Sequence, residues 1–256
     1  MTRNIRLALT LLLVTPGLMG CASAPTNKNR PPDDPSKVAD LNTQLAIAYV
    51  RDGENELALK KLERAVSVDP NYAPAYSTMG LLYNRVGAFD KADSNFRKAL
   101  RLDPENSSIL NNYGQVLCQH GQYGKGQEMF LKANENLLYR SPEIAFSNAG
   151  TCALAAGDVA NAETHFREAL QINPRVASAL LQMSGISYDL GRYLPSRGYL
   201  QRYLEIAKHT PKSLWLGIRI ERELDDKDAL ASYALQLENG YPDSQETRLL
   251  LESKTN

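Results

Sequence analysis

The feature that most constrains this sequence is a set of residue types that recurs about every 34 positions. Glycine stands at equivalent places in five successive segments, with intervals of 34, 34, 36 and 34 residues between them. These glycines are Gly53, Gly87, Gly121, Gly157 and Gly191. A fixed period of this length predicts a repeat architecture in place of one or two globular domains.

The repeating units are counted from Ala39 and cover residues 39–72, 73–106, 107–142, 143–176, 177–210 and 211–244. Small residues recur at positions 8, 20 and 27, and position 24 is a large apolar residue. Small residues let two helices approach closely, and a glycine at position 15 suits a left-handed helix end. Prolines at position 32, such as Pro70 and Pro104, end the second helix. Each unit is therefore predicted to be a pair of antiparallel helices.

This pattern resembles the tetratricopeptide repeat. The resemblance implies an all-α, right-handed solenoid of about six helix-turn-helix units, whose stacking buries a continuous core. The unit 211–244 is degenerate, and its second half fits the pattern equally well when shifted by one residue. Residues 245–256 are expected to form a short capping helix with a polar outer face.

The N-terminal residues 1–20 have the layout of a secretory signal peptide. Arg3 and Arg6 precede an apolar run at 7–14, and Pro16 and Gly17 then break the helix. The alternative is a retained membrane anchor. It is disfavoured because proline, glycine and threonine dilute the uncharged run, whereas a spanning helix needs about 20 mostly apolar residues.

The residues that follow, Leu18-Met19-Gly20-Cys21, resemble the bacterial lipobox, although Met19 stands where that motif usually has a small residue. The resemblance implies acylation of Cys21, and this covalent lipid is the only non-protein group we expect, with no cofactor. An unmodified cysteine beside a plain cleavage site is the alternative. Ala22 in place of aspartate favours the outer membrane, with the domain facing the periplasm. The proline-rich segment 21–38 is predicted to be a flexible tether.

Composition and motifs argue against several function classes. Lys plus Arg and Asp plus Glu each total 29, so the chain lacks the basic field of many nucleic-acid binders. The three histidines lie far apart in sequence, and we find no phosphate loop, paired-cysteine or zinc-protease motif. We therefore expect no enzyme activity, metal site, nucleic-acid partner or small-molecule substrate.

Two cysteines lie on the predicted first helices of neighbouring units, Cys118 at position 12 of the third and Cys152 at position 10 of the fourth. An oxidising envelope compartment permits a disulfide between them. A bridge requires Cα atoms within about 7 Å. We favour two buried small hydrophobic side chains over a bridge.

Partner binding in such repeats uses the concave face, lined by positions 2, 5, 9, 12 and 13 of each first helix. This groove mixes small polar, amide and aliphatic side chains and suits an amphipathic helix or an extended peptide. It lacks the Lys/Arg and Asn set that clamps a C-terminal carboxylate in some tetratricopeptide proteins. Packing between units is the alternative role for any one residue. The candidate partner-binding residues are Thr43, Ile47, Val50, Ser77, Leu81, Asn84, Asn111, Gln115, Ser147, Thr151, Leu154, Leu181 and Tyr188.

Four segments carry a closer resemblance: Leu110-Asn111-Asn112-Tyr113-Gly114, residues 193–203, the LWLGIRI sequence at 214–220, and residues 233–244. They are similar to the PilF/PilW family of type IV pilus biogenesis lipoproteins. The resemblance implies a pilotin, which binds the secretin subunit of the pilus machine and promotes its outer-membrane localisation and multimerisation. The alternatives are a scaffold of another envelope machine, such as barrel assembly or peptidoglycan regulation, or a protease adaptor.

Overall fold

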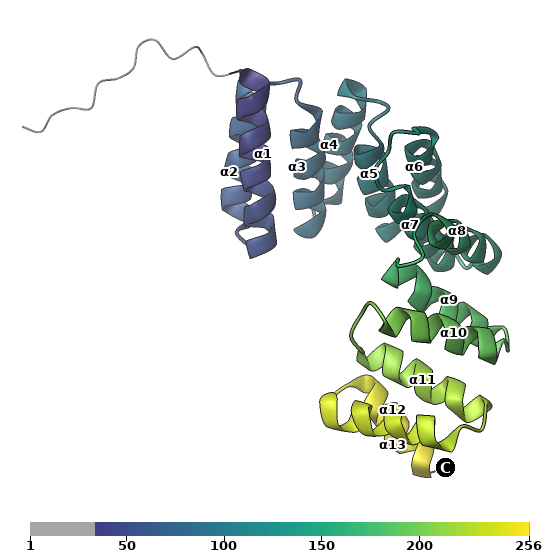
Figure 1. Cartoon of the computed structure of the whole chain (residues 1–256). Helices are drawn as coiled ribbons and strands as arrows, with labels where there is room; N and C mark the ends of the chain where they lie inside the picture. The colour runs from purple at the N-terminus through teal and green to yellow at the C-terminus, as the bar shows by residue number, and fades with distance from the viewer. Residues whose placement is uncertain (1–33, 256) are drawn as a thin grey trace, which may run out of the picture. The chain divides into compact units, whose positions relative to one another are not determined.

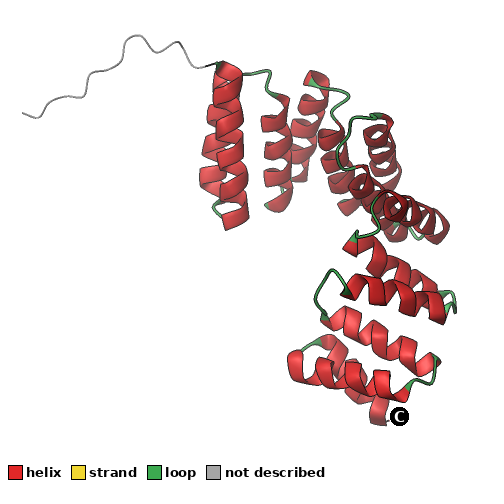
Figure 2. Ribbon diagram, in the orientation of Figure 1, coloured by secondary structure: helices red, strands yellow, loops and turns green. Residues whose placement is uncertain are grey.

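A computed structural model describes residues 34–255, and this part of the chain contains 13 helices and no strand (Figures 1 and 2). The predicted signal peptide at 1–20, the predicted lipidation site Cys21 and most of the predicted tether lie outside the described residues. The prediction of an all-α solenoid of about six helix pairs is confirmed.

Consecutive helices form antiparallel pairs, and each pair packs on the next along the chain (Figure 1). The first three pairs are α1 (Pro35–Asp52) with α2 (Asn55–Val68), α3 (Ala73–Arg85) with α4 (Phe89–Leu102), and α5 (Ser107–Gln119) with α6 (Tyr123–Glu135). The next three are α7 (Pro142–Ala155) with α8 (Val159–Ile172), α9 (Ala177–Asp189) with α10 (Tyr193–Leu204), and α11 (Pro211–Glu223) with α12 (Lys227–Gly240). The last helix, α13 (Gln245–Thr255), packs on α11 and α12.

The start of α1 corrects one predicted boundary. The tether was expected to extend to residue 38, but the helix begins at Pro35. Proline suits the first turn of a helix because its missing N–H would have no partner there. The side chain of Asp34 also accepts a hydrogen bond from the backbone N–H of Ser36 at 3.0 Å. These two local signals extend the helix into the proline-rich segment.

In the second, third, fourth and sixth pairs, the close approach of the two helices depends on a glycine beneath an aromatic ring. A methyl group added at Gly80 would lie 2.6 Å from two ring carbons of Phe96, which is fully buried. Gly150 has the same relation to Phe166, at 2.7 Å. No side chain larger than a hydrogen atom fits under these rings without moving them, and this explains the small residues at position 8.

The turn inside each pair uses the left-handed backbone region. The five repeated glycines have φ angles between 70° and 85°. In the sixth pair, Asp225 takes their place with a φ of 54°, and it is the one positive-φ residue other than glycine in the described part of the chain. Aspartate tolerates this region better than most residues.

The sixth pair contains one helix–helix contact that is displaced by one residue along the sequence. Gly217 lies against the ring of Tyr233, where an added methyl group would be 3.0 Å away, and their separation of 16 residues (233 minus 217) equals that of Gly80 and Phe96. In the frame that starts at residue 211, positions 8 and 24 are residues 218 and 234, so Gly217 and Tyr233 each lie one residue before the predicted position. This contact is therefore one residue out of frame, whereas the turn residue Asp225 and the bounds of α11 and α12 keep the frame that starts at residue 211.

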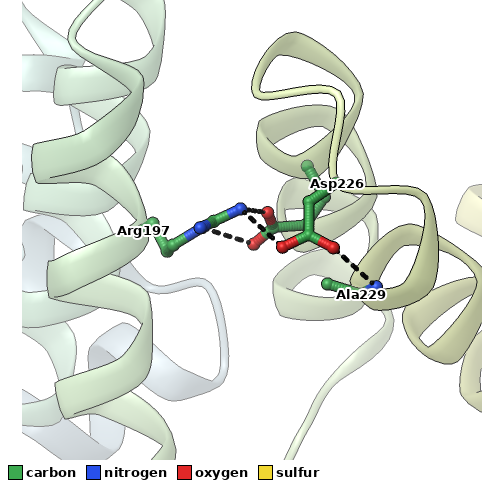
Figure 3. Close-up of polar contacts among 4 residues, drawn as sticks. Arg197, Asp226 and Ala229 are labelled. Atoms are coloured by element: carbon green, nitrogen blue, oxygen red, sulfur yellow. Dashed lines mark hydrogen bonds and ion pairs between the residues drawn. The ribbon is translucent and has the colours of Figure 1, made fainter.

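A partly buried ionic cluster ties α10 to the end of α11 and to the turn between α11 and α12 (Figure 3). The carboxylate of Glu221, only 3% exposed, accepts hydrogen bonds from both Nε and Nη2 of Arg197, the former at 3.0 Å. The same Nη2 contacts Asp226 at 3.2 Å, and Asp226 also accepts from the backbone N–H of Ala229 at 3.1 Å. A buried carboxylate needs such partners to offset its lost hydration.

The preference for unbridged cysteines is wrong, because Cys118 and Cys152 form a disulfide between α5 and α7, with Cα atoms 5.6 Å apart. The reason lies at Gly126, which stands where other units have alanine or serine. A methyl group there would overlap the Sγ atom of Cys118. The missing side chain makes room for the sulfur, so the glycine was a usable sequence signal.

The glycine–ring contact leads to a first prediction. Gly80→Ala and Gly185→Ala each replace a glycine inside a first helix by alanine. Because alanine has the higher helix propensity, this replacement alone stabilises a helix by about 1 kcal/mol. Nothing lies within 4 Å of a methyl group at Gly185, whereas Phe96 must move at Gly80. Gly80→Ala is expected to be the less stable variant by about 1–3 kcal/mol, the usual cost of overpacking. Urea unfolding of both variants measures this difference, and equal stabilities would contradict the packing argument.

The disulfide leads to a second prediction. Replacing Cys118 and Cys152 together by serine is expected to lower the free energy of unfolding by about 2–4 kcal/mol, because the bridge restricts a 34-residue stretch of the unfolded chain. Chemical denaturation with and without a reductant measures this. Reductant should destabilise the wild-type chain and leave the double variant unchanged. A reductant effect of similar size on both proteins would show that the bridge is not the cause.

Candidate partner-binding face

The first helices of successive units pack against one another in the series α1, α3, α5, α7, α9 and α11, and they bring the predicted partner-binding residues onto one succession of helices. Three of these residues are exposed: Ile47, at 45%, Gln115 and Thr151. Six are partly buried, namely Val50, Leu81, Asn84, Leu154, Leu181 and Tyr188. These nine side chains remain candidates for contact with a partner.

Four of the five residues predicted at position 5 are buried, which argues against direct contact with a partner, whereas the fifth, Leu181, is partly exposed. The exposed fractions of Thr43, Ser77, Asn111 and Ser147 lie between 2% and 8%. Thr43 donates to the carbonyl oxygen of Ala39 at 2.8 Å, so its hydroxyl is satisfied within its own helix. Position 5 therefore points between neighbouring first helices, and the polar residue type there reflects packing against backbone and small side chains.

A polar contact crosses each junction between first helices. Arg85 of α3 donates to the carbonyl oxygen of Val50 on α1, and Asn84 donates to Gln119 of α5 at 2.9 Å. Between α5 and α7, Asn148 donates to Asn111 at 2.9 Å, and between α7 and α9 the hydroxyls of Ser147 and Ser178 lie 2.8 Å apart. Between α9 and α11, Arg219 pairs with Asp189 at 3.5 Å, and Arg222 of α11 donates to Ser253 of α13 at 3.1 Å. These contacts hold the face in one arrangement and use part of its hydrogen-bonding capacity.

Four aliphatic candidates have a double role, and Val50, which packs against the first core cluster, is one of them. Leu81, Leu154 and Leu181 each pack against a buried core cluster while remaining partly exposed. A polar substitution at any of them would disturb packing as well as a partner contact. Ile47 belongs to no core cluster and is the cleaner probe of the face.

Ring and charge contacts fix the two ends of the face. On α9, the ring of Tyr188 lies under the guanidinium of Arg219 at 4.0 Å and against Tyr193 at 5.4 Å. At the other end, the hydroxyl of Tyr72 donates to Asp40 at 2.7 Å. Burial, and then this hydrogen bond to a carboxylate, raises the pKa of Tyr72, so it stays neutral and keeps donating.

A pocket of about 170 Å³ opens between α5 and α7, beside the disulfide. Its lining combines the two half-cystines and Phe130 with amide, hydroxyl and methyl groups, contributed by Gln115, Gln119, Asn148, Thr151 and Ala155. Gln115 and Thr151 were predicted on this face from their repeat positions, but the pocket was not, because the bridged cysteines and Phe130, which come together only in the fold, form part of its wall.

The described residues carry no arrangement suited to metal chemistry, since no group of three or more His, Cys, Asp or Glu side chains is placed to hold an ion. Within the same range, none of the helices combines the length and the apolar character needed to cross a membrane.

Comparison with known proteins agrees with this architecture. Two family models described as tetratricopeptide repeat match residues 73–106 and 95–128. The type IV pilus assembly protein PilF of Pseudomonas aeruginosa is 32% identical over 244 residues, which cover 95% of this chain and 96% of that protein.

Solved structures show the same relationship. A structure reported in the functional characterization of Pseudomonas aeruginosa PilF superimposes with a TM-score of 0.79 at 30% identity, covering 86% of this chain and 99% of that one. The crystal structure of PilW, a widely conserved type IV pilus biogenesis factor, gives a TM-score of 0.76 at 28% identity, covering 84% and 99%. The chain therefore belongs to the PilF family of tetratricopeptide type IV pilus assembly proteins.

Proposed function

We propose that this protein is a pilotin: an outer-membrane lipoprotein that binds the secretin subunit of the type IV pilus machine and promotes its localisation and multimerisation. The observation that carries the proposal is the similarity to a type IV pilus assembly protein over 95% of the chain. That similarity includes all six helix pairs, so the binding face is part of what the two proteins share.

The structure supports a binding role that involves no reaction. The first-helix face offers partly exposed aliphatic side chains, among them Ile47 and Leu181, beside amide and hydroxyl groups. Such a mixture suits a polypeptide segment, whose backbone needs hydrogen-bond partners and whose side chains need apolar contacts. The polar contacts across the junctions arrange this face before a partner arrives, which lowers the ordering cost of binding.

The lipobox supplies the second half of the proposal. Acyl chains on Cys21 would hold the N-terminal end at the outer membrane while the helical domain reaches into the periplasm. Several acyl chains anchor stably, whereas one chain alone gives marginal binding. Holding client and membrane together raises the local concentration of secretin subunits where they insert.

Recovery of partners from an envelope extract tests the proposal against its alternatives. The full-length chain, purified in mild detergent, should recover secretin subunits. Recovery of barrel-assembly or peptidoglycan hydrolase subunits without secretin would reject the pilotin role in favour of another envelope machine. A deletion strain with altered proteolysis but normal secretin multimers would favour a protease adaptor.

The lipid anchor gives a third prediction. Cys21→Ser is expected to leave the helical domain folded but release the protein from the outer-membrane fraction, because no acyl chain is attached. Secretin multimers should then fall in the outer membrane, as measured by membrane fractionation and immunoblotting. Unchanged secretin localisation with a released protein would contradict the anchor model.

The first-helix face gives a fourth prediction, which uses two isoleucines of similar exposure. Ile47 of α1 is 45% exposed on this face, and Ile172 of α8 is 49% exposed on a second helix. Ile47→Arg is expected to weaken secretin binding about tenfold or more, while Ile172→Arg changes it less than twofold. Both substitutions should shift unfolding by at most about 0.5 kcal/mol, as is usual for surface positions. Equal binding by the two variants in a titration with purified secretin would place the interface elsewhere.

A further inference from the structure

Two adjacent leucines stand almost free of the protein in the connection between α6 and α7. Leu137 is 97% exposed and Leu138 is 88% exposed, whereas no other Leu, Ile or Val in the described part of the chain exceeds 67%. Single exposed leucines are ordinary on a protein surface, but two neighbours that touch almost nothing form an apolar projection. The fold gains nothing from their side chains, so only a second surface can bury them.

The connection is built to display these side chains. It has six residues, 136–141, and Leu137 stands second in it, where the three four-residue connections between pairs have a proline. The side chain of Asn136 accepts from the backbone N–H of Leu138 at 2.9 Å, and its carbonyl oxygen accepts from the backbone N–H of Tyr139 at 3.0 Å. The half-buried ring of Tyr139 packs on a core cluster shared by α5, α6 and α7. The turn is therefore held at its base while the two leucines project.

The charges around this loop are mixed. Two neighbouring hollows beside Leu138 are lined by three carboxylates and two cations, which belong to Asp103, Glu105, Glu135, Lys132 and Arg140. A surface of this kind attracts neither an anionic nor a cationic partner strongly. The two leucines must therefore supply most of the free energy of any contact made here, and the surface that receives them must be apolar.

The loop lies at the edge of the stack where α1 begins. The helices of each pair are antiparallel and the first helices run in the same direction, so the connections between pairs lie where first helices start (Figure 1). Three junctions separate α1 from α7, which is about 30 Å if neighbouring helices pack about 8–10 Å apart. The 12 residues 22–33 link Cys21 to the described domain, and a chain of this length can extend over about 40 Å. A bilayer that holds Cys21 is therefore within reach of the loop.

We propose that Leu137 and Leu138 insert into the surface of the bilayer that holds the lipidated N-terminus, so that the domain is held at two points. The leucines gain by leaving water, and the lipid anchor keeps them close to the bilayer, so a weak contact suffices. The loop lies at the helix ends, and the contact leaves the first-helix face free for a partner. This inference rests on the proposed function, because it needs the acyl chains on Cys21.

A fluorescent dye on the loop tests the contact. Leu137→Cys gives the full chain one thiol for an environment-sensitive dye, because Cys118 and Cys152 are bridged and acylated Cys21 has no free thiol. The wild-type chain should take up no dye. Leu194→Cys is the matched control, because Leu194 is 67% exposed on α10, beside the turn inside the fifth pair and so at the opposite edge.

Both labelled chains are reconstituted into phosphatidylcholine vesicles that contain brominated acyl chains. The dye at 137 should be quenched about threefold more than the dye at 194, because side chains that insert at an interface reach the acyl boundary. Adding anionic phosphatidylglycerol should leave this ratio unchanged, since the surrounding charges are mixed. Equal quenching at the two positions would overturn the membrane contact, and quenching only with phosphatidylglycerol would overturn the apolar mechanism.

A double variant, Leu137→Ser with Leu138→Ser, distinguishes the bilayer from a protein partner. Recovery of secretin from a detergent extract involves no bilayer, so the double variant should recover as much secretin as the wild-type chain and as Leu194→Ser. Both leucines are almost fully exposed, so the fold should be unaffected, as circular dichroism can verify. A specific loss of secretin from the double variant would mean that the leucines contact that protein, and the membrane assignment would be wrong.

Flotation of the vesicles separates this inference from the proposed function. If the labelled chains float with the vesicles but neither dye is quenched, the lipid anchor stands and the inserted loop is wrong. If they do not float, the anchor is wrong and the inserted loop is rejected with it. If the dye at 137 is quenched as expected but the wild-type chain recovers no secretin, the membrane contact stands and the pilotin role is wrong.

Discussion

In four of the six helix pairs, the contact between a glycine of one helix and an aromatic ring of its partner sets how closely the two helices approach, while the first and fifth pairs have Ala46 and Ser184 at that position. Gly80 under Phe96 and Gly150 under Phe166 leave no room for a side chain, so the two helix axes come as close as backbone and ring allow. Each pair then presents its first helix in the same orientation, and stacking brings these helices into direct contact. The binding face is thus a consequence of packing inside each pair.

Because each unit contacts mainly its neighbours, the face is held junction by junction. Most junctions between first helices are crossed by a single polar contact, such as that of Ser147 with Ser178 or of Arg219 with Asp189. These contacts draw on the same small polar and amide residues that a partner could use. A polar residue on the face therefore has two possible roles, and its exposure and existing hydrogen bonds decide between them.

The repeat allowed most of the fold to be predicted from sequence, since glycine at position 15 and proline at position 32 set the turns by local backbone chemistry. The site was less predictable. Asn111 and Ser147 share a first helix with exposed candidates, but the rotation of each helix against its neighbour, a tertiary property, buries them. The disulfide was not predicted because the separation of the two Cα atoms is a tertiary property, and the space left at Gly126 decides where the sulfur of Cys118 lies.

The disulfide has a particular value in a stack of this kind. Without a central core, a solenoid can open at any junction, and opening between α5 and α7 would divide the binding face into two halves. The polar contact between Asn111 and Asn148 crosses this junction at the cost of removing two amides from solvent. The covalent bond adds a tie that does not depend on hydration, and its sulfurs form part of the wall of the pocket between these two helices. One pair of cysteines therefore stabilises the centre of the stack and shapes the surface of the candidate binding face there.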